Sequence, residues 1–215
     1  MMKSADEMSY SDIGALTDEA QSISRKSRSI VAKAVGSDAP EDRVRQRCII
    51  ATGDISVGEL LRFKNDPVEA GLRALQSCAG IYVDIKMVEA GIVKKGHQSQ
   101  VISLLGRGDD LAGELGITRT SAGVLASKDL LNDSIVIIGN APSSLISLCR
   151  VIVEGIMPAL VIGTPVGFVN AAESKEMLRE LAVPSISTVG TRGGTPVAVA
   201  AMNEIINMYY EKSNP

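Results

Sequence analysis

The chain has 215 residues, of which 45% are hydrophobic and 3% aromatic, and its formal net charge is −3 at pH 7. This length suits one large domain better than two and supplies enough apolar residues for a substantial core. The slightly acidic balance argues against a nucleic-acid-binding protein, and the few aromatic residues leave little surface for stacking bases. We therefore expect a single α/β domain over residues 1–215 and no nucleic-acid partner.

The N-terminal ten residues are polar and acidic, unlike a signal peptide, so we expect a flexible segment at 1–10 and a cytoplasmic protein. No apolar run reaches the ~18 residues that a membrane span requires, so no membrane association is expected. The three cysteines, Cys48, Cys78 and Cys149, are far apart and lie among apolar residues. They are typical of reduced core thiols, with a catalytic thiol as the alternative, and no metal cluster is predicted.

Segments typical of helices and strands alternate along the chain. The expected strands are the apolar runs 48–52, 81–83, 101–105, 134–138, 159–162 and 185–189. The expected helices are 11–35, one starting at Pro40, 68–77, 87–90, 118–130, 142–154, 170–181 and 195–210. Continuous apolar strands between helices indicate a parallel sheet covered on both faces. We predict a doubly wound α/β fold of about five strands.

The segment 162–175 carries the strongest sign of a ligand site. Gly163, Pro165 and Gly167 form a turn between an apolar strand and a helix that begins at Asn170. Ligands bind at such C-terminal strand ends in parallel sheets, and glycines let the backbone approach a ligand closely. Asn170 is a good helix cap, and the free N–H groups behind it favour a carboxylate.

Two further junctions repeat this pattern. Gly139 and Asn140 follow a strand and precede Pro142, where a helix begins. This junction is either an ordinary strand-to-helix connection or a wall of hydrogen-bond donors for a carboxylate ligand. Arg192 and Gly193 precede the last helix, where the arginine is either solvated or positioned for a ligand.

Other polar residues are open to two interpretations. Arg119 stands at a helix start, against the helix dipole, which slightly favours a ligand-facing role. The basic cluster at 24–28, with Ser27, is either a solvated helix face or a binding surface for acidic groups. His97, the single histidine, lies in a polar turn and is either solvent-exposed or catalytic.

Several of these segments together resemble the precorrin-8X methylmutase family, called cobalt-precorrin-8 methylmutase in the anaerobic pathway. The matching residues are 139–142, 163–169, 171–175, 192–194 and Asn203; Asp84, Met87, Val88 and Gly91; Thr118 and Arg119, with Ile117 in place of the family's asparagine; and Ser27. The resemblance spans roughly residues 20 to 208 in unbroken order.

The resemblance implies a flavodoxin-like α/β enzyme that moves a methyl group from C11 to C12 of a corrin precursor in cobalamin biosynthesis. It implies no organic cofactor, a tetrapyrrole substrate rich in carboxylates, and a homo-oligomer, with a dimer expected. It also implies that Ser27, Arg119 and Arg192 bind substrate acid groups, while Gly139, Asn140, Gly163, Pro165, Gly167 and Gly193 line the ring pocket.

One departure from the family is important for the chemistry. The family places a histidine, thought to supply the proton for the shift, where this chain has Ile50. Isoleucine cannot donate a proton. Substitute donors would be His97 or Thr52.

Three functions therefore remain open from the sequence. The first is an active methylmutase that uses another donor or water. The second is a relative that binds a tetrapyrrole or another polycarboxylate without catalysis. The third is a different small-molecule enzyme on the same scaffold.

Overall fold

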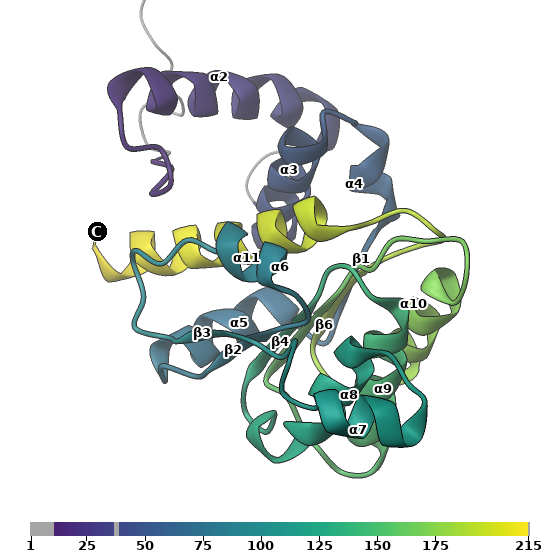
Figure 1. Ribbon diagram of the computed structural model, residues 1–215. Coiled ribbons are helices and arrows are strands. Elements are labelled where there is room, and N and C mark those ends of the chain that lie inside the picture. The colour runs from purple at the N-terminus through teal and green to yellow at the C-terminus, as the bar shows by residue number, and fades with distance from the viewer. Residues whose placement is uncertain (1–10, 37–38, 215) are drawn as a thin grey trace, which may run out of the picture.

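The computed structural model describes residues 11–36 and 39–214, so the predicted flexible segment 1–10 lies outside the described residues. A six-stranded sheet forms the centre of the molecule (Figure 1). Its strands are β1 (Leu61–Lys64), β2 (Ile81–Val83), β3 (Val101–Ser103), β4 (Ile135–Ile138), β5 (Leu160–Gly163) and β6 (Ser185–Thr188).

The strand order is β1-β6-β5-β4-β2-β3. Strands β2 to β6 are all parallel, and β1 pairs antiparallel with β6 at the edge. Without β1, the order matches the flavodoxin-like arrangement, in which the order of strand addition reverses between the adjacent first and third parallel strands, here β2 and β4. The predicted fold class is confirmed, with one antiparallel edge strand added.

Alternation along the strands separates two cores, because successive strand side chains point to opposite faces. Ile135 and Ile137 of β4 belong to one core, and Val136 and Ile138 belong to the other. The first core is covered by α5 (Pro67–Gln76), α6 (Lys86–Gly91) and α11 (Thr195–Ser213). The second is covered by α8 (Arg119–Ala126), α9 (Pro142–Val153) and α10 (Ala171–Glu180), with α7 (Asp109–Leu115) beside α8.

Two N-terminal helices form an additional layer on the first face. Helix α3 (Pro40–Thr52) packs on α11, and α2 (Asp18–Val35) packs on α3, farthest from the sheet (Figure 1). Only Val31 of α2 is buried among its 18 residues. Helix α2 is therefore held mainly by polar contacts and not by an apolar seam.

The predicted strand at 48–52 is wrong, because these residues form the last turns of α3. Pro40 starts the helix at a position that tolerates its missing N–H, and Gly53 ends it in the left-handed conformation with φ 66°. The buried residues Val44, Cys48 and Ile49 recur at helical spacing. The true first strand, β1, follows α4 (Ser56–Leu60) and was not predicted.

Two of the three cysteines are core thiols, as predicted. Burial raises the pKa of Cys48 and of Cys149 to about 12, so neither is a thiolate near neutral pH. Cys78 differs from the prediction, since it is exposed in the turn after α5 with a positive φ of 57°.

Candidate active site

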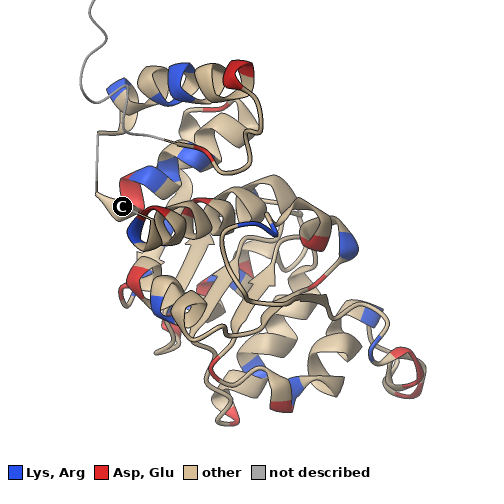
Figure 2. Cartoon of the chain, turned by 90° about the vertical axis from the view of Figure 1, so that its left-hand side faces the viewer, with Lys and Arg blue, Asp and Glu red and all other residues tan. Residues whose placement is uncertain are grey.

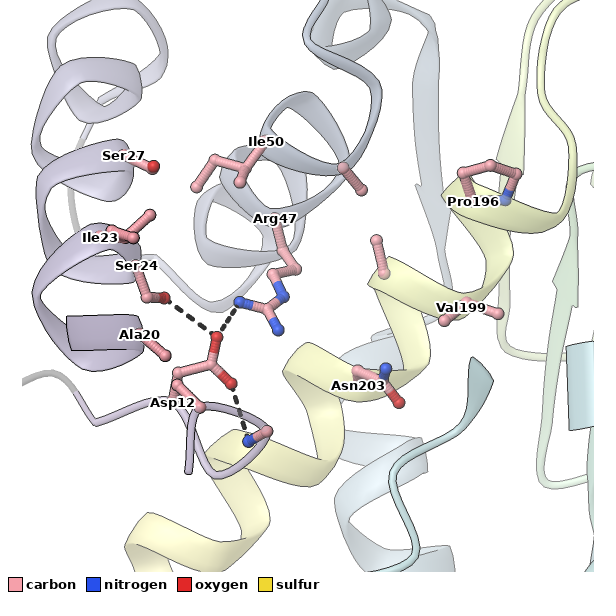
Figure 3. Close-up of a pocket in the computed structure, with 14 residues that line it drawn as sticks. Asp12, Ala20, Ile23, Ser24, Ser27, Arg47, Ile50, Pro196, Val199 and Asn203 are labelled. Atoms are coloured by element: carbon pink, nitrogen blue, oxygen red, sulfur yellow. Dashed lines mark hydrogen bonds and ion pairs between the residues drawn. The ribbon is translucent and has the colours of Figure 1, made fainter. Parts of the chain in front are cut away.

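A cavity of about 560 Å³ lies between α2, α3 and α11 (Figure 3). Its walls come from the segment before α2 and from all three helices. The lining residues are Asp12, Gly14, Ala15, Ala20, Ile23, Ser24, Ser27, Arg47, Ile50, Ala51, Pro196, Val199, Ala200 and Asn203. Most of them are apolar or small, as in sites that bind an apolar ligand body and orient it with a few polar groups.

Helix α3 places Ile50 and Arg47 on the same wall, because residues three apart share a helix face. Ser27 lies opposite them on α2 (Figure 3). Asn203 faces the cavity from α11, where its side chain bonds the N–H of Val93 and the carbonyl of Gly91, both at 3.0 Å. Ser27, Ile50 and Asn203, which the sequence singled out, are therefore brought together from three helices.

A charged cluster stands at the edge of this cavity. The Asp12 carboxylate accepts hydrogen bonds from Ser24 Oγ at 3.0 Å and from the Gly14 N–H at 2.9 Å, and it pairs with Arg47 Nη1. Burial works against the charged carboxylate, but Arg47 outweighs it, so the pKa of Asp12 is lowered. Asp12 is thus ionised at neutral pH.

A second, buried ion network joins the helices that surround the cavity. Glu204 of α11 is fully buried and pairs with Arg28 of α2 at 2.7 Å and with Arg43 of α3 at 2.9 Å. Arg43 also bonds Glu211 through both Nη atoms, at 2.7 and 3.0 Å. Figure 2 shows basic and acidic residues interspersed on this helical layer at the top of the view. The network fixes α2 and α3 against α11 and so sets the shape of the cavity.

The two substitute proton donors lie elsewhere. Thr52 follows Ile50 on α3, but its Oγ1 bonds the carbonyls of Cys48 and Ile49 at 2.9 and 3.2 Å. His97 Nε2 bonds the Val93 carbonyl at 2.8 Å in the loop before β3. Neither residue is among those that line the cavity.

In the turn after β4, two backbone N–H groups are bonded within the protein, which is the pattern of an ordinary strand-to-helix connection. The N–H groups of Asn140 and Ala141 donate to Oδ2 of Asp84 at 2.8 and 3.0 Å. Asp84 is fully buried at the end of β2, and burial raises its pKa despite these bonds. Its carboxylate lies between the ends of β2 and β4, where the order of strand addition reverses. In this fold that point is the usual ligand crevice.

The glycines of these turns face the protein interior. A Cβ on Gly139 would come within 2.9 Å of Ala198, and one on Gly163 within 2.5 Å of Leu178. A Cβ on Gly193 would come within 2.3 Å of the Thr164 carbonyl, to which the next residue, Gly194, donates its N–H. Gly139, Gly163 and Gly193 therefore allow close packing of backbone and helices, whereas a Cβ on Gly167 would meet nothing closer than 3.8 Å.

The turns after β5 and β6 are tied together beside the start of α11. The N–H of Gly167 donates to the Thr191 carbonyl at 3.0 Å. Pro165 is buried, whereas the Phe168 side chain is 95% exposed. Asn170 precedes α10 in the left-handed conformation, and its side chain caps no N–H, contrary to the prediction.

The two arginines predicted to bind the substrate are exposed and ion-paired. Arg119 bonds Asp109 through Nε at 2.9 Å and through Nη2 at 2.7 Å. Arg192 pairs with Asp54 and bonds Ser56 at 2.8 Å. Neither arginine lines the cavity.

The buried side chain of Lys175 in α10 holds the turn after β6 in place by hydrogen bonds. Its fully buried ammonium donates to Thr188 Oγ1 at 3.1 Å and to the Arg192 carbonyl at 2.8 Å. Burial lowers the pKa of Lys175 to about 8, and the positive charge of Arg179 acts in the same direction.

This lysine makes the pH dependence of stability testable. Between pH 8 and 10.5 the unfolded chain holds a proton on Lys175 that the folded chain has lost, so stability rises with pH in this window. From the lower to the upper end of this pH window, we expect the free energy of unfolding of the wild type to rise by up to about 3 kcal/mol relative to that of Lys175→Met. Urea unfolding of both proteins from pH 7.5 to 10.5 measures this, and parallel profiles would contradict it.

Lining residues that were not predicted from the sequence include Arg47, Asp12 and the α11 residues Pro196 and Val199. Reading 40–52 as one helix would have placed Arg47 on the face of Ile50. Within the described residues, no group of three or more His, Cys, Asp or Glu side chains is arranged to hold a metal ion.

The fold is that of a doubly wound α/β protein, and an additional helical layer forms a cavity with its last helix. Residues 22–208 match the family model described as precorrin-8X methylmutase. The chain belongs to the precorrin-8X methylmutase family, whose members are isomerases of cobalamin biosynthesis.

Individual relatives agree with this assignment. The cobalt-precorrin-8 methylmutase of Methanocaldococcus jannaschii is 42% identical over 207 residues, covering 90% of this chain and 96% of the relative. The precorrin-8X methylmutase of Pseudomonas aeruginosa is 38% identical over 197 residues, covering 87% and 95%. The solved precorrin-8X methyl mutase of Thermus thermophilus superposes with a TM-score of 0.81 at 38% identity, covering 88% of this chain and 96% of that one.

No helix in the described ranges combines the length and the apolar character needed to cross a bilayer.

Proposed function

We propose that this protein moves a methyl group from C11 to C12 of precorrin-8X or cobalt-precorrin-8, and that the cavity between α2, α3 and α11 is the substrate site. The observation that carries the proposal is the convergence of Ser27, Ile50 and Asn203 on this cavity. These positions come from three helices: Ser27 and Asn203 match the family in sequence, and Ile50 stands where the family's histidine is expected.

The cavity suits an intramolecular rearrangement of a large ring. Ile23, Ile50 and Val199 offer apolar surface to the ring, while polar groups at the edge can fix its orientation. Such a shift exchanges no electrons with a partner, so the protein contributes by holding the ring and by controlling protonation. This cavity alone is small for a macrocycle, so part of the ring extends beyond it into the open side.

Protonation is the step in which this chain differs from the family pattern. Among the described residues lining the cavity, Asp12 is ionised and Arg47 is permanently charged, so neither is an acid near neutral pH. Ser24 and Ser27 are only weak acids. The proton then comes from water at the open side of the cavity, and the shift is slower than with a histidine at position 50.

The remaining expectations complete the proposal. The chain acts as one domain, as a homo-oligomer with a dimer expected, in the cytoplasm and without an organic cofactor.

The direct test is to mix the purified protein with precorrin-8X or its cobalt form and follow the visible absorption spectrum. Conversion to the corrin spectrum supports the proposal. Tight binding without conversion would show a binding protein on this scaffold, and absence of binding would show a different ligand.

A further inference from the structure

The amide of Asn203 stands in the cavity wall with its two ends fixed by the backbone of the loop after α6. Its Oδ1 accepts the N–H of Val93, and its Nδ2 donates to the carbonyl of Gly91, both at 3.0 Å. A flipped amide would set N–H against N–H and oxygen against oxygen, so these two backbone groups determine which end is the donor. Asn203 and Val199 lie one turn apart on α11 and line the same cavity (Figure 3).

The loop that holds this amide is itself fixed. His97 Nε2 donates to the Val93 carbonyl at 2.8 Å, which closes the loop on itself. Ile92, between the two residues that bond the amide, is only 2% exposed and belongs to the first core. The Asn203 side chain is therefore preorganised and loses little conformational entropy when a ligand binds to it.

One N–H of this amide remains for a ligand. An amide side chain has two N–H donors and two oxygen lone pairs, and the bonds that Asn203 makes to described residues use one of each. The bond through Nδ2 is exposed, whereas the bond through Oδ1 is partly buried, so the nitrogen lies on the open side. An ionised carboxylate can only accept hydrogen bonds, so the second N–H is the group that such a ligand can use.

We infer that the second N–H of Asn203 donates to a side-chain carboxylate of the corrin substrate, and that Asn203 thereby makes the site selective for the free acid. The inference rests on the proposed function. It places a carboxylate contact inside the cavity, whereas Arg119 and Arg192 lie outside it. A hydrogen bond to a charged acceptor is stronger than one to a neutral acceptor, so the acid gains more from this contact than an ester does.

The test compares two probes, a dicyanocobalt corrin with free side-chain carboxylates and the methyl ester of the same corrin, with binding followed by absorption or calorimetry. The wild type should bind the free acid more tightly than the ester. Asn203→Asp replaces the donor by a negatively charged acceptor of nearly the same shape. The ratio of acid affinity to ester affinity should therefore fall at least about tenfold in this variant.

Asn207→Asp is the matched control. Asn207 lies one turn later on α11 and does not line the cavity, and its Oδ1 accepts the Ile13 N–H while its Nδ2 donates to Glu211, both at 3.0 Å. Each aspartate keeps one bond from a backbone N–H, loses one donor bond and adds one negative charge to the same helix. In Asn207→Asp the affinity ratio should stay within about threefold of that of the wild type.

Asn203→Ala removes the donor without adding a charge, and it carries the test if thermal unfolding shows that Asn203→Asp is not folded. Its affinity ratio should fall by about 3- to 10-fold. A loss of stability alone would weaken binding of acid and ester equally. Equal losses for the two probes, an unchanged ratio, or the same fall in Asn207→Asp would overturn the role of Asn203 alone. If the wild type bound neither corrin, the proposed function would fail together with this inference.

Discussion

Ile50→His should raise the rate of the methyl shift by about 10²-fold, since general acid catalysis by a positioned side chain contributes roughly 10²- to 10⁴-fold. Position 50 is half-buried on the cavity wall, opposite Ser27. It is the position at which the resemblance to the family implies a histidine. Single-turnover kinetics with precorrin-8X or its cobalt form, followed by absorption, measure the effect.

The rate should also acquire a new pH dependence. The imidazolium is the donor, so the gain should be largest at low pH and should disappear as the pH rises through the pKa of the new histidine.

Ile50→Asn is the matched control, because it introduces a polar group of smaller size that cannot act as an acid near neutral pH. It should leave the rate near that of the wild type. A well-folded Ile50→His protein that binds substrate but gains no rate would show that the cavity has been rebuilt for other chemistry.

Glu204→Gln should lower the free energy of unfolding by about 3 kcal/mol, because breaking a buried ion pair leaves a charge without compensation. The glutamate is fully buried, and it pairs with Arg28 and Arg43, which come from different helices. Burial disfavours the charged form of Arg43, but Glu211 and Glu204 outweigh this and raise its pKa. For a chain of this size the melting temperature should fall by roughly 6–12 °C.

The same variant should loosen the cavity, since the network fixes α2 and α3 against α11. Corrin affinity should therefore fall with stability. Glu69→Gln is the comparison: it breaks an exposed pair with Lys212 at 3.0 Å, and exposed pairs contribute about 0–1 kcal/mol. A loss no larger in Glu204→Gln than in Glu69→Gln would refute the assignment of the network as the anchor of α2.

The sheet was largely predictable because local patterns determine it. The apolar runs that became β2 to β6 were all identified, and glycine or proline marks most of the junctions. The edge strand β1 was missed because Leu61–Lys64 is only 4 residues long, too short for its alternation of apolar and charged residues to stand out. The segment 48–52 was misread because Cys48, Ile49 and Ile50 form an apolar run that periodicity alone assigns to either class.

The position of the site was harder to predict because it depends on contacts between distant segments. The rule that ligands bind at C-terminal strand ends pointed to Gly139 and Asn140, yet Asp84, more than 50 residues earlier, fills that crevice. Nothing local in the sequence shows that Asp84 turns inward. The cavity forms only when α2 and α3 pack on α11, and the ion pairs that hold them link residues more than 150 positions apart.

The most direct measurement concerns where the corrin binds. Ala51 lines the cavity from an exposed position, and its neighbour Thr52 is exposed on α3 outside the lining residues. Titration of a cobalt corrin with free carboxylates into Ala51→Trp should show at least about tenfold weaker binding than in the wild type, because the indole fills the cavity, while Thr52→Trp binds normally. Wild-type affinity in both variants would place the substrate elsewhere on the protein.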